Sequence, residues 1–124
     1  MKILIAEDDI ASCLLLKRTL KKISREVLQV QTGIEAIDAC RNNPDIDLIL
    51  MDVRMPGMTG YDATRQIRGF NKDIIIIAQT AEAFAGDKEK AIEAGCNEYL
   101  SKPIDQDELM VLIRKYFNKE FSAK

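Results

Sequence analysis

The sequence predicts an α/β fold in which five strands and five helices alternate around one parallel sheet. Apolar segments of strand length alternate with longer segments of helical period, and no Pro/Ser-rich linker, repeat or low-complexity stretch interrupts them. The first, third and fourth strand candidates are apolar at nearly every position, which is typical of parallel strands buried on both faces. Right-handed crossovers then place helices on both faces of the sheet, which gives a doubly wound (βα)5 arrangement.

The individual elements follow from apolar runs and from capping signals. Asp9 is predicted to cap the first helix, and Thr32 with Glu35 has the spacing of a capping box at the second. Gly95 stands where the fourth helix would end in a left-handed residue, and Asp105 precedes the fifth helix. In chain order, strands are predicted at 3–6, 27–30, 48–51, 74–78 and 99–100, and helices at about 10–23, 33–42, 60–68, 84–94 and 106–117.

Composition indicates one domain and excludes several kinds of chemistry. The 124 residues are 47% hydrophobic, enough to form one core without disulfides or a structural metal. The chain contains no His, which excludes Ser-His and Cys-His catalytic pairs, imidazole zinc sites and a phosphohistidine of its own. The net charge is −2 and no basic stripe is present, so we expect no direct nucleic-acid binding.

Cysteine usage and the first residues bear on the compartment. Cys13, Cys40 and Cys96 leave one Cys unpaired under any pairing and form no C-x-x-C, which disfavours a disulfide framework. The apolar run at 3–6 is too short for a signal peptide or a membrane span. We therefore expect a cytoplasmic protein without membrane insertion, and we interpret Cys13, Cys40 and Met110 as packing residues.

Polar residues follow the strands at the edge where a doubly wound sheet forms its binding crevice. Separate segments of the chain thus deliver carboxylates, a hydroxyl and an ammonium group to one place. These residues are Glu7, Asp8 and Asp9 after the first strand, Asp52 after the third, Gln79 and Thr80 after the fourth, and Ser101 and Lys102 after the fifth.

The charges at this edge predict a divalent cation. Glu7, Asp8 and Asp52 would bring −3 against +1 from Lys102. Two carboxylates about 4 Å apart repel by roughly 4 kcal/mol at an effective dielectric of 20. Carboxylates without His or Cys are hard oxygen ligands, which suit Mg²⁺ and, as a second candidate, Mn²⁺.

Such a metal usually shares its coordination sphere with phosphate oxygens, so we expect a phosphoryl group at this edge. Asp52 is the natural acceptor, because it ends an apolar strand where a carboxylate oxygen can attack in line. Lys102 would neutralise charge that develops on the phosphoryl oxygens, and Thr80 would donate to the product. The predicted product is a covalent aspartyl phosphate.

Four segments together resemble the receiver domains of two-component response regulators. They are ILIAEDD at 3–9, LILMDVRMPGMTG at 48–60, Thr80-Ala81 and YLSKP at 99–103, and the resemblance covers almost the whole chain. It implies a flavodoxin-like, CheY-like receiver fold with strand order 2-1-3-4-5, which alternation alone does not select. It also implies a single receiver domain over residues 1–124, with no output domain in this chain.

The resemblance assigns metal ligands and the acceptor. Asp52 would be the phosphorylation site, and Asp8 would bind Mg²⁺ directly. Glu7 would act largely through water, and the backbone carbonyl of Arg54 would complete the ligands that the protein supplies.

The resemblance also assigns residues that respond to phosphorylation. Lys102 would contact the phosphoryl group, and the Lys102–Pro103 bond is expected to be cis. Thr80 would move toward the phosphoryl group, and Tyr99 would change orientation with Thr80. The fourth helix, the fifth strand and the fifth helix would then form the face that binds a downstream protein.

The implied function is a phosphoacceptor switch in a two-component phosphorelay. The phosphoryl donor would be a phosphohistidine on a sensor histidine kinase or a histidine phosphotransfer protein. Such a chain is a signalling phosphoacceptor and not an enzyme, although it takes part in its own phosphorylation and dephosphorylation. Both a free-standing regulator and a receiver cut from a hybrid kinase fit the sequence.

Three other functions use the same architecture or the same residues. A degenerate receiver would be a phosphorylation-independent docking module, against which the intact acidic cluster argues. A flavodoxin-like FMN binder would need a phosphate-cradling loop after the first strand, where Glu7, Asp8 and Asp9 would repel the phosphate. An aspartyl-phosphate phosphatase would carry Asp-x-Asp, and here Arg54 occupies the second Asp position.

Two positions suggest a hypothesis about the lifetime of the phosphorylated form. Arg54 lies two residues after Asp52, and Glu82 lies two residues after Thr80. An ion pair between Arg54 and Glu82 at the mouth of the cleft would hinder the water molecule that hydrolyses the acyl phosphate.

Overall fold

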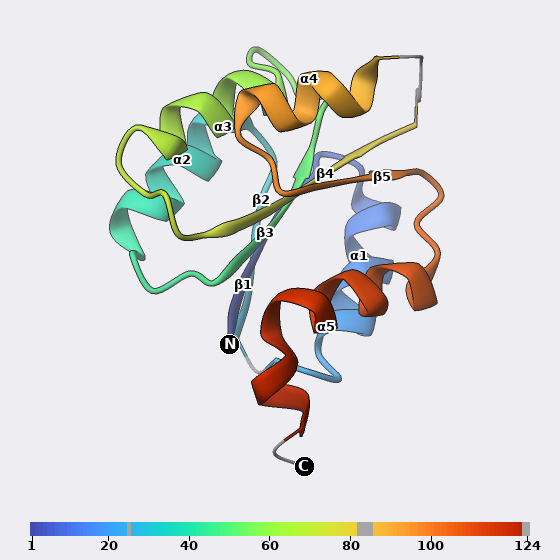
Figure 1. The fold of residues 1–124 in the computed structure, drawn as a ribbon. Coiled ribbons are helices and arrows are strands. Elements are labelled where there is room, and N and C mark those ends of the chain that lie inside the picture. The colour runs from blue at the N-terminus through green and yellow to red at the C-terminus, as the bar shows by residue number, and fades with distance from the viewer. Residues whose placement is uncertain (25, 82–85, 123–124) are drawn as a thin grey trace.

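The computed structural model describes residues 1–24, 26–81 and 86–122, and it shows five strands alternating with five helices (Figure 1). In chain order the elements are β1 (Lys2–Ala6), α1 (Ile10–Leu20), β2 (Glu26–Val30), α2 (Gly33–Asn42), β3 (Leu48–Asp52), α3 (Gly60–Arg68), β4 (Ile75–Thr80), α4 (Asp87–Ala94), β5 (Glu98–Ser101) and α5 (Gln106–Ser122).

The strands form one parallel sheet in the order β2-β1-β3-β4-β5. β1 is hydrogen-bonded to β2 and β3, β3 to β4, and β4 to β5, and every pairing is parallel. The doubly wound fold and the strand order expected from the sequence are confirmed.

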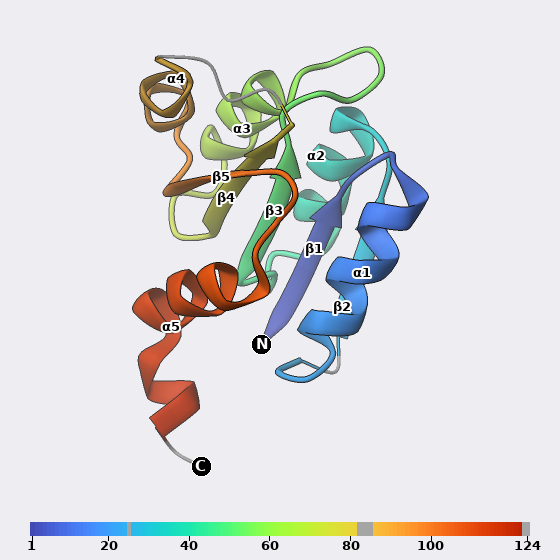
Figure 2. The ribbon, with the colours of Figure 1, turned by 90° about the vertical axis from the view of Figure 1, so that its right-hand side faces the viewer.

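Helices cover both faces of the sheet, α1 and α5 on one face and α2, α3 and α4 on the other (Figure 2). Strand residues alternate between the two layers, as the period of two requires. The core under α1 and α5 contains Ile3, Ile5, Leu48, Leu50, Ile77 and Leu100 from the strands, and the core under α2, α3 and α4 contains Leu4, Ala6, Ile49, Met51, Ile76 and Ala78.

The predicted capping signals are confirmed. The Asp9 side chain accepts a hydrogen bond from the Ser12 backbone N–H at 2.9 Å and caps α1. Thr32 and Glu35 form a reciprocal capping box at α2. Gly95 ends α4 with a φ of 114°, which places it in the left-handed region that favours glycine.

Element boundaries differ from the prediction where hydrogen bonding continues or stops. β3 includes Asp52 and β4 reaches Thr80, because the ladder pairs Asp52 with Gln79 and Thr80 with Ser101. α1 ends at Leu20 and not at 23, because the Lys22 and Ile23 N–H groups donate to the Thr19 and Leu20 carbonyls three residues back and not to carbonyls four residues back. α5 continues to Ser122, with non-helical angles at Phe117 where its end was predicted.

The fourth helix begins at Asp87 and not at 84, because the described residue Gly86 precedes it with a left-handed φ of 88°; residues 82–85 lie outside the described part of the chain. Within the described ranges, no helix combines the length and the apolar character needed to cross a membrane. Cys13 and Cys40 are buried in the core, as the packing interpretation predicted, and Met110 packs partly buried against the core under α1 and α5.

Candidate phosphoacceptor site

Four polar side chains continue the strand rows that face α1 and α5. Glu7 comes two residues after Ile5, Asp52 after Leu50, Gln79 after Ile77 and Lys102 after Leu100, and all four of these apolar residues belong to the core under α1 and α5. We call Glu7, Asp52, Gln79 and Lys102 the α1-side row. Side-chain alternation along the strands therefore places carboxylates, an amide and an ammonium group together at the carboxyl edge of the sheet.

Backbone hydrogen bonds keep this row aligned beyond the ends of two strands. The Glu7 N–H donates to the Val30 carbonyl at 3.0 Å, and the Lys102 N–H donates to the Thr80 carbonyl at 2.8 Å. Each ladder thus extends one residue further than the strand that carries it, which fixes the starting points of the Glu7 and Lys102 side chains.

The Lys102 ammonium group lies between two buried carboxylates. Its Nζ atom is 2.6 Å from Glu7 Oε1 and 3.5 Å from Asp52 Oδ2. The exposed fractions of these side chains are 0% for Glu7, 5% for Asp52 and 18% for Lys102. Because such charges are scarcely solvated, each depends on its neighbours for stabilisation.

The proximity of Glu7 raises the pKa of the Asp52 carboxyl. Burial, together with a hydrogen bond to and repulsion from the Glu7 carboxyl, raises the pKa of Asp52 to about 7, against the opposing effects of Lys102 and the Arg54 N–H. Burial alone would lower the pKa of Lys102, but its contacts with Glu7 and Asp52 outweigh burial and raise it. The site therefore has an excess of negative charge that a single ammonium group does not neutralise.

Glu7, Asp8 and Asp52 form a candidate cation site. One ligand oxygen from each residue lies within 4.8 Å of the others. Asp8 is exposed at the mouth of the cluster, whereas Glu7 and Asp52 are buried. An all-oxygen donor set with two buried acidic groups fits Mg²⁺ and provides no thiolate or imidazole for a softer metal.

The loop between β3 and α3 is held closely over Asp52. The Arg54 N–H donates to Asp52 Oδ1 at 3.2 Å, and the Gly60 N–H donates to the Val53 carbonyl at 2.8 Å. A Cβ atom at Gly60 would overlap the Asp52 backbone carbonyl, so only glycine permits this approach. The loop thereby places the Arg54 backbone beside the Asp52 carboxyl.

Thr80 and Tyr99 lie on the opposite side of the sheet edge, and we call them the α4-side pair. Tyr99 packs against the core under α2, α3 and α4, and Thr80 lines a recess with Tyr61 and Asp87. The Tyr99 hydroxyl is buried and has no hydrogen-bond partner among the residues that the structure describes. The Lys102–Pro103 peptide bond that follows β5 is cis.

Of the two residues in the lifetime hypothesis, Arg54 and Glu82, the structure describes only Arg54. Arg54 is exposed and lines the same recess as Thr80. Glu82 lies outside the described residues.

Two contacts of the site were not predicted from the sequence. Gln79 donates from its side-chain Nε2 to Glu7 Oε1 at 3.4 Å, and it is 2% exposed. The Tyr61 hydroxyl donates to the Asp87 carbonyl in the first turn of α4 at 3.3 Å. An amide directly after the apolar run 74–78 was the available signal for Gln79, because amides are seldom buried without a polar partner.

The sequence of this chain matches a known protein family and curated relatives over most of its length. The response regulator receiver domain family matches residues 3–114. The sensor protein GacS of Pseudomonas syringae pv. syringae is 35% identical over 120 residues, which cover 93% of this chain and 13% of GacS. The chain thus spans about an eighth of the length of that relative.

Solved receiver domains share the fold. The receiver domain of the sensor histidine kinase PA1611 from Pseudomonas aeruginosa PAO1, crystallised with a magnesium ion in its active-site cleft, has a TM-score of 0.83 and 35% identity, over 94% of this chain and 97% of that one. The Saccharomyces cerevisiae receiver domain of Ssk1, crystallised with the histidine phosphotransfer protein Ypd1, has a TM-score of 0.86 and 31% identity, over 94% and 88% of the chains. This chain belongs to the response regulator receiver domain family of two-component signal transduction.

Proposed function

We propose that Asp52 is the phosphoacceptor of this receiver domain and that its donor is a phosphohistidine on a partner protein. An Asp52 carboxylate oxygen forms a bond to phosphorus as the bond from phosphorus to the imidazole nitrogen breaks. The imidazole nitrogen keeps the electron pair and takes up a proton, and Asp52 becomes an acyl phosphate.

The observation that carries this proposal is the position of the Asp52 carboxyl. It is almost fully buried at the carboxyl edge of the sheet, within 3.5 Å of the Lys102 ammonium group and beside the oxygens of Glu7 and Asp8. A structural aspartate has no need of a second buried carboxylate beside it, since the two repel each other. A site that receives a cation and a phosphoryl group explains the arrangement.

Mg²⁺ is the proposed cofactor, with Mn²⁺ as the alternative. Asp8, Asp52 and the Arg54 carbonyl would bind it, and Glu7 would act largely through water. The bound ion supplies charge neutralisation and orientation of the phosphoryl oxygens. The acidic donor set supports this assignment, and so does the magnesium ion in the PA1611 receiver domain.

Phosphorylation would change the charge at Asp52, and the new contacts of the phosphoryl group would stabilise the phosphorylated conformation. A phosphoryl group carries about −1.5 to −2 charge units, and because the Asp52 carboxylate gives up its own −1 on forming the acyl phosphate, the net change at Asp52 is about −0.5 to −1. Charge-assisted hydrogen bonds are worth roughly 1.5–3 kcal/mol each, so new contacts from Lys102 and Thr80 supply about 3–6 kcal/mol. About 5.5 kcal/mol carries a two-state equilibrium from 1:99 to 99:1, so two such contacts at the upper end of this range are enough to switch the domain.

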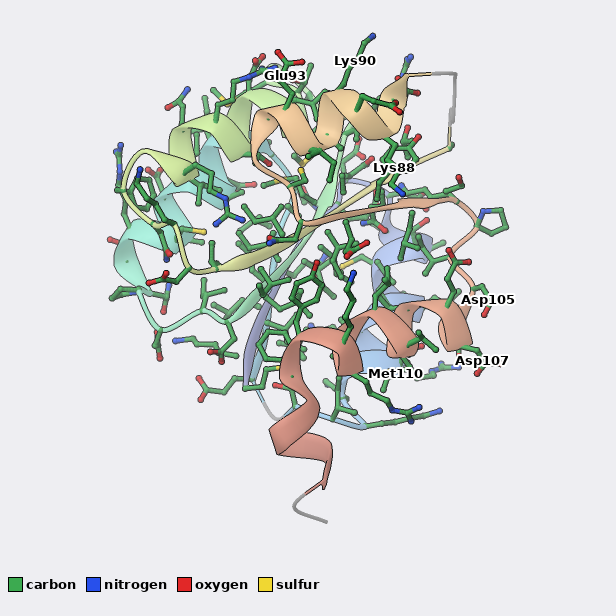
Figure 3. All side chains as sticks on the ribbon, viewed as in Figure 1. Lys88, Lys90, Glu93, Asp105, Asp107 and Met110 are labelled. Carbon is green, nitrogen blue, oxygen red and sulfur yellow. The ribbon has the colours of Figure 1, made fainter. Side chains whose placement is uncertain are left out.

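The α4-side pair is proposed to transmit this change. Thr80 moves toward the phosphoryl group, and Tyr99, whose buried hydroxyl makes no hydrogen bond among the described residues, changes orientation with it. The affected surface would comprise α4, β5 and α5. In Figure 3, Lys88 lies on the side of α4 that faces β5, which gives this surface a charged group for a downstream protein to bind.

The relatives of the chain support a proposal about the context of the domain. We propose a single receiver domain over residues 1–124 that works as a phosphoacceptor and not as an enzyme with its own substrate turnover. A sensor histidine kinase or a histidine phosphotransfer protein is the proposed donor, which the GacS relative and the complex of Ssk1 with Ypd1 support.

Intact mass after incubation with acetyl phosphate tests the proposed function. With Mg²⁺, the wild type is expected to gain the mass of one phosphoryl group, and it is expected to gain none in EDTA. Asp52→Asn, which keeps the size of the side chain, serves as the matched control and is expected to gain none under either condition. A folded wild type that gains nothing with Mg²⁺ would instead support a phosphorylation-independent docking module.

A further inference from the structure

Gln79 is a buried amide on a face of β4 whose other residues, Ile75 and Ile77, are apolar. Its side chain is 2% exposed, and it follows Ile77, which is 1% exposed on the same face of β4. Burying an amide in place of an aliphatic side chain is unfavourable unless its polar atoms find partners. The Gln79 side chain therefore has a polar role in this part of the molecule.

The backbone register aims Gln79 at the acidic cluster. Gln79 is the ladder partner of Asp52, and paired residues of parallel strands direct their side chains to the same face of the sheet. On its other side Gln79 borders a small, mainly apolar recess of about 80 Å³ between α1 and the start of α5. The amide thus separates an apolar recess from the carboxylates.

The Glu7 carboxylate receives donors from three directions. Lys102 Nζ lies 2.6 Å from Oε1, Gln79 Nε2 lies 3.4 Å from the same oxygen, and the Asp9 N–H lies 3.2 Å from Oε2. Gln79 is the one neutral side chain among these donors, so its contact does not depend on the charge elsewhere in the cluster.

Lys102 is shared between Glu7 and Asp52, and Gln79 is not. The Lys102 ammonium group lies closer to Glu7 than to Asp52, 2.6 Å against 3.5 Å. Phosphorylation favours the Asp52 side, because it replaces the single charge of the carboxylate with about −1.5 to −2 charge units on the phosphoryl oxygens. When Lys102 contacts the phosphoryl group, Glu7 loses its charged donor while it remains buried.

We propose that Gln79 is a positioning residue that holds the Glu7 carboxylate in its metal-binding orientation when Lys102 turns to the phosphoryl group. The inference rests on the proposed function, since it requires both a cation and a phosphoryl group at the site. Gln79 acts through Glu7 and touches neither the phosphoryl group nor the metal.

Mg²⁺ affinity measured by isothermal titration calorimetry tests the role of Gln79. Gln79→Met keeps the shape of the side chain and removes its N–H donors, and it is expected to weaken Mg²⁺ binding about 10-fold, as the loss of a group that orients a metal ligand does. Ile77→Met, at an equally buried position on the same face of β4, is the matched control and is expected to leave the affinity within about 2-fold of the wild type.

Gln79→Met in a Lys102→Met background tests whether Gln79 holds Glu7 when the Lys102 ammonium group is absent. There Gln79 is the remaining side-chain donor of the three, so Gln79→Met is expected to weaken Mg²⁺ binding by about 30-fold or more, a larger factor than in the wild type. A purely structural role would lower the unfolding temperature in EDTA equally in both backgrounds and leave the two affinity ratios the same. Gln79→Asn, whose amide is one methylene shorter, gives an intermediate loss and serves in place of Gln79→Met if that variant does not fold.

The outcomes separate this inference from the proposed function. A wild type that binds Mg²⁺ and gains a phosphoryl group, while Gln79→Met behaves as Ile77→Met does, overturns the role of Gln79 alone. A folded wild type that neither binds Mg²⁺ nor gains a phosphoryl group overturns both. Weaker Mg²⁺ binding in Gln79→Met, with the phosphorylation rate at saturating Mg²⁺ changed less than about 2-fold, supports a positioning role.

Discussion

The α1-side row and the α4-side pair lie on opposite faces of the same sheet edge. They differ in how completely their polar groups are hydrogen-bonded. Lys102 contacts both Glu7 and Asp52 in the α1-side row, and Gln79 donates to Glu7. On the α4 side, Tyr99 buries a hydroxyl that has no hydrogen-bond partner in the described parts of the chain. On one side of the sheet edge the charged groups are already in contact, and on the other the described residues supply no hydrogen bond to the Tyr99 hydroxyl.

This difference suggests a division of labour within one edge. Preorganised charges lower the cost of placing a cation and a phosphoryl group, because they need little rearrangement during the reaction. A buried hydroxyl without a partner disfavours the state that contains it by about 1–3 kcal/mol. The proposed change of shape on phosphorylation would use such a marginal element, and the α4-side pair provides one at the same edge of the sheet as Asp52.

The largest expected effect is on the phosphorylation rate, which we expect a substitution in the α1-side row to change far more than one in the α4-side pair. Lys102→Met removes the charge that faces the developing phosphoryl oxygens, so phosphorylation by acetyl phosphate is expected to slow about 100-fold, as the loss of one charge-assisted contact implies. Thr80→Ala is expected to change this rate less than about 5-fold and to abolish the effect of phosphorylation on α4. The rate is read by intact mass, and the response of α4 by amide chemical shifts with and without acetyl phosphate.

The division of labour would be wrong if Thr80→Ala slowed phosphorylation as much as Lys102→Met does. Circular dichroism controls for folding, since Lys102→Met leaves two buried carboxylates without their ammonium partner.

The second prediction concerns the pH dependence of folding stability, which follows from the repulsion between the Glu7 and Asp52 carboxylates in the α1-side row. The pKa of Asp52 is raised from 3.8 to about 7 in the folded protein, so the protonated form favours folding. This contribution is complete below about pH 4 and is lost as the pH rises through 7. In EDTA, Asp52→Asn is therefore expected to gain stability relative to the wild type between pH 4 and pH 8, on the order of 2–4 kcal/mol.

Urea unfolding at pH 4, 6 and 8 measures this difference. Saturating Mg²⁺ is expected to reduce it, because the cation replaces the proton at the carboxylates and stabilises the folded wild type. A constant difference between wild type and Asp52→Asn across this pH range would show that the Asp52 carboxyl is not strained by Glu7.

Residue order was enough to predict the sheet and the identity of most of the edge residues. The alternation of apolar and amphipathic segments gave the (βα)5 order, and the resemblance gave the strand order. Carboxyl-end geometry then brought Glu7, Asp52 and Lys102 together. These inferences succeed because each depends on chain order and on strand direction, which the sequence contains.

The assignment of side chains to the two faces could not be predicted in the same way. The run 74–78 is apolar throughout, so it carries no alternation that tells which residue faces α1 and which faces α4. Gln79 and Thr80 were both placed after the predicted strand, whereas the ladder includes both and turns them to opposite faces. Only the packing of α1 and α5 against Ile77 decides that Gln79, and not Thr80, reaches Glu7.

The smallest expected effect concerns the rim between the two sides, where Arg54 lies. Arg54 is exposed beside the recess that Thr80 lines, and its backbone N–H donates to Asp52. Arg54→Ala keeps the backbone N–H and carbonyl but removes the side chain that would shield the acyl phosphate from water. The half-life of the phosphorylated protein is expected to shorten by about 2- to 10-fold, a barrier change of about 0.4–1.4 kcal/mol.

The decay of the phosphorylated mass after removal of acetyl phosphate measures this half-life. Arg65→Ala is the matched control, because Arg65 is an exposed arginine on α3 that pairs with Asp62 at 2.9 Å, away from the recess. Glu82→Ala is expected to act in the same direction as Arg54→Ala if the two side chains pair at the mouth of the cleft. A half-life that neither Arg54→Ala nor Glu82→Ala changes would restrict control of the lifetime to the α1-side row itself, where the charge around Asp52 would set the rate of hydrolysis.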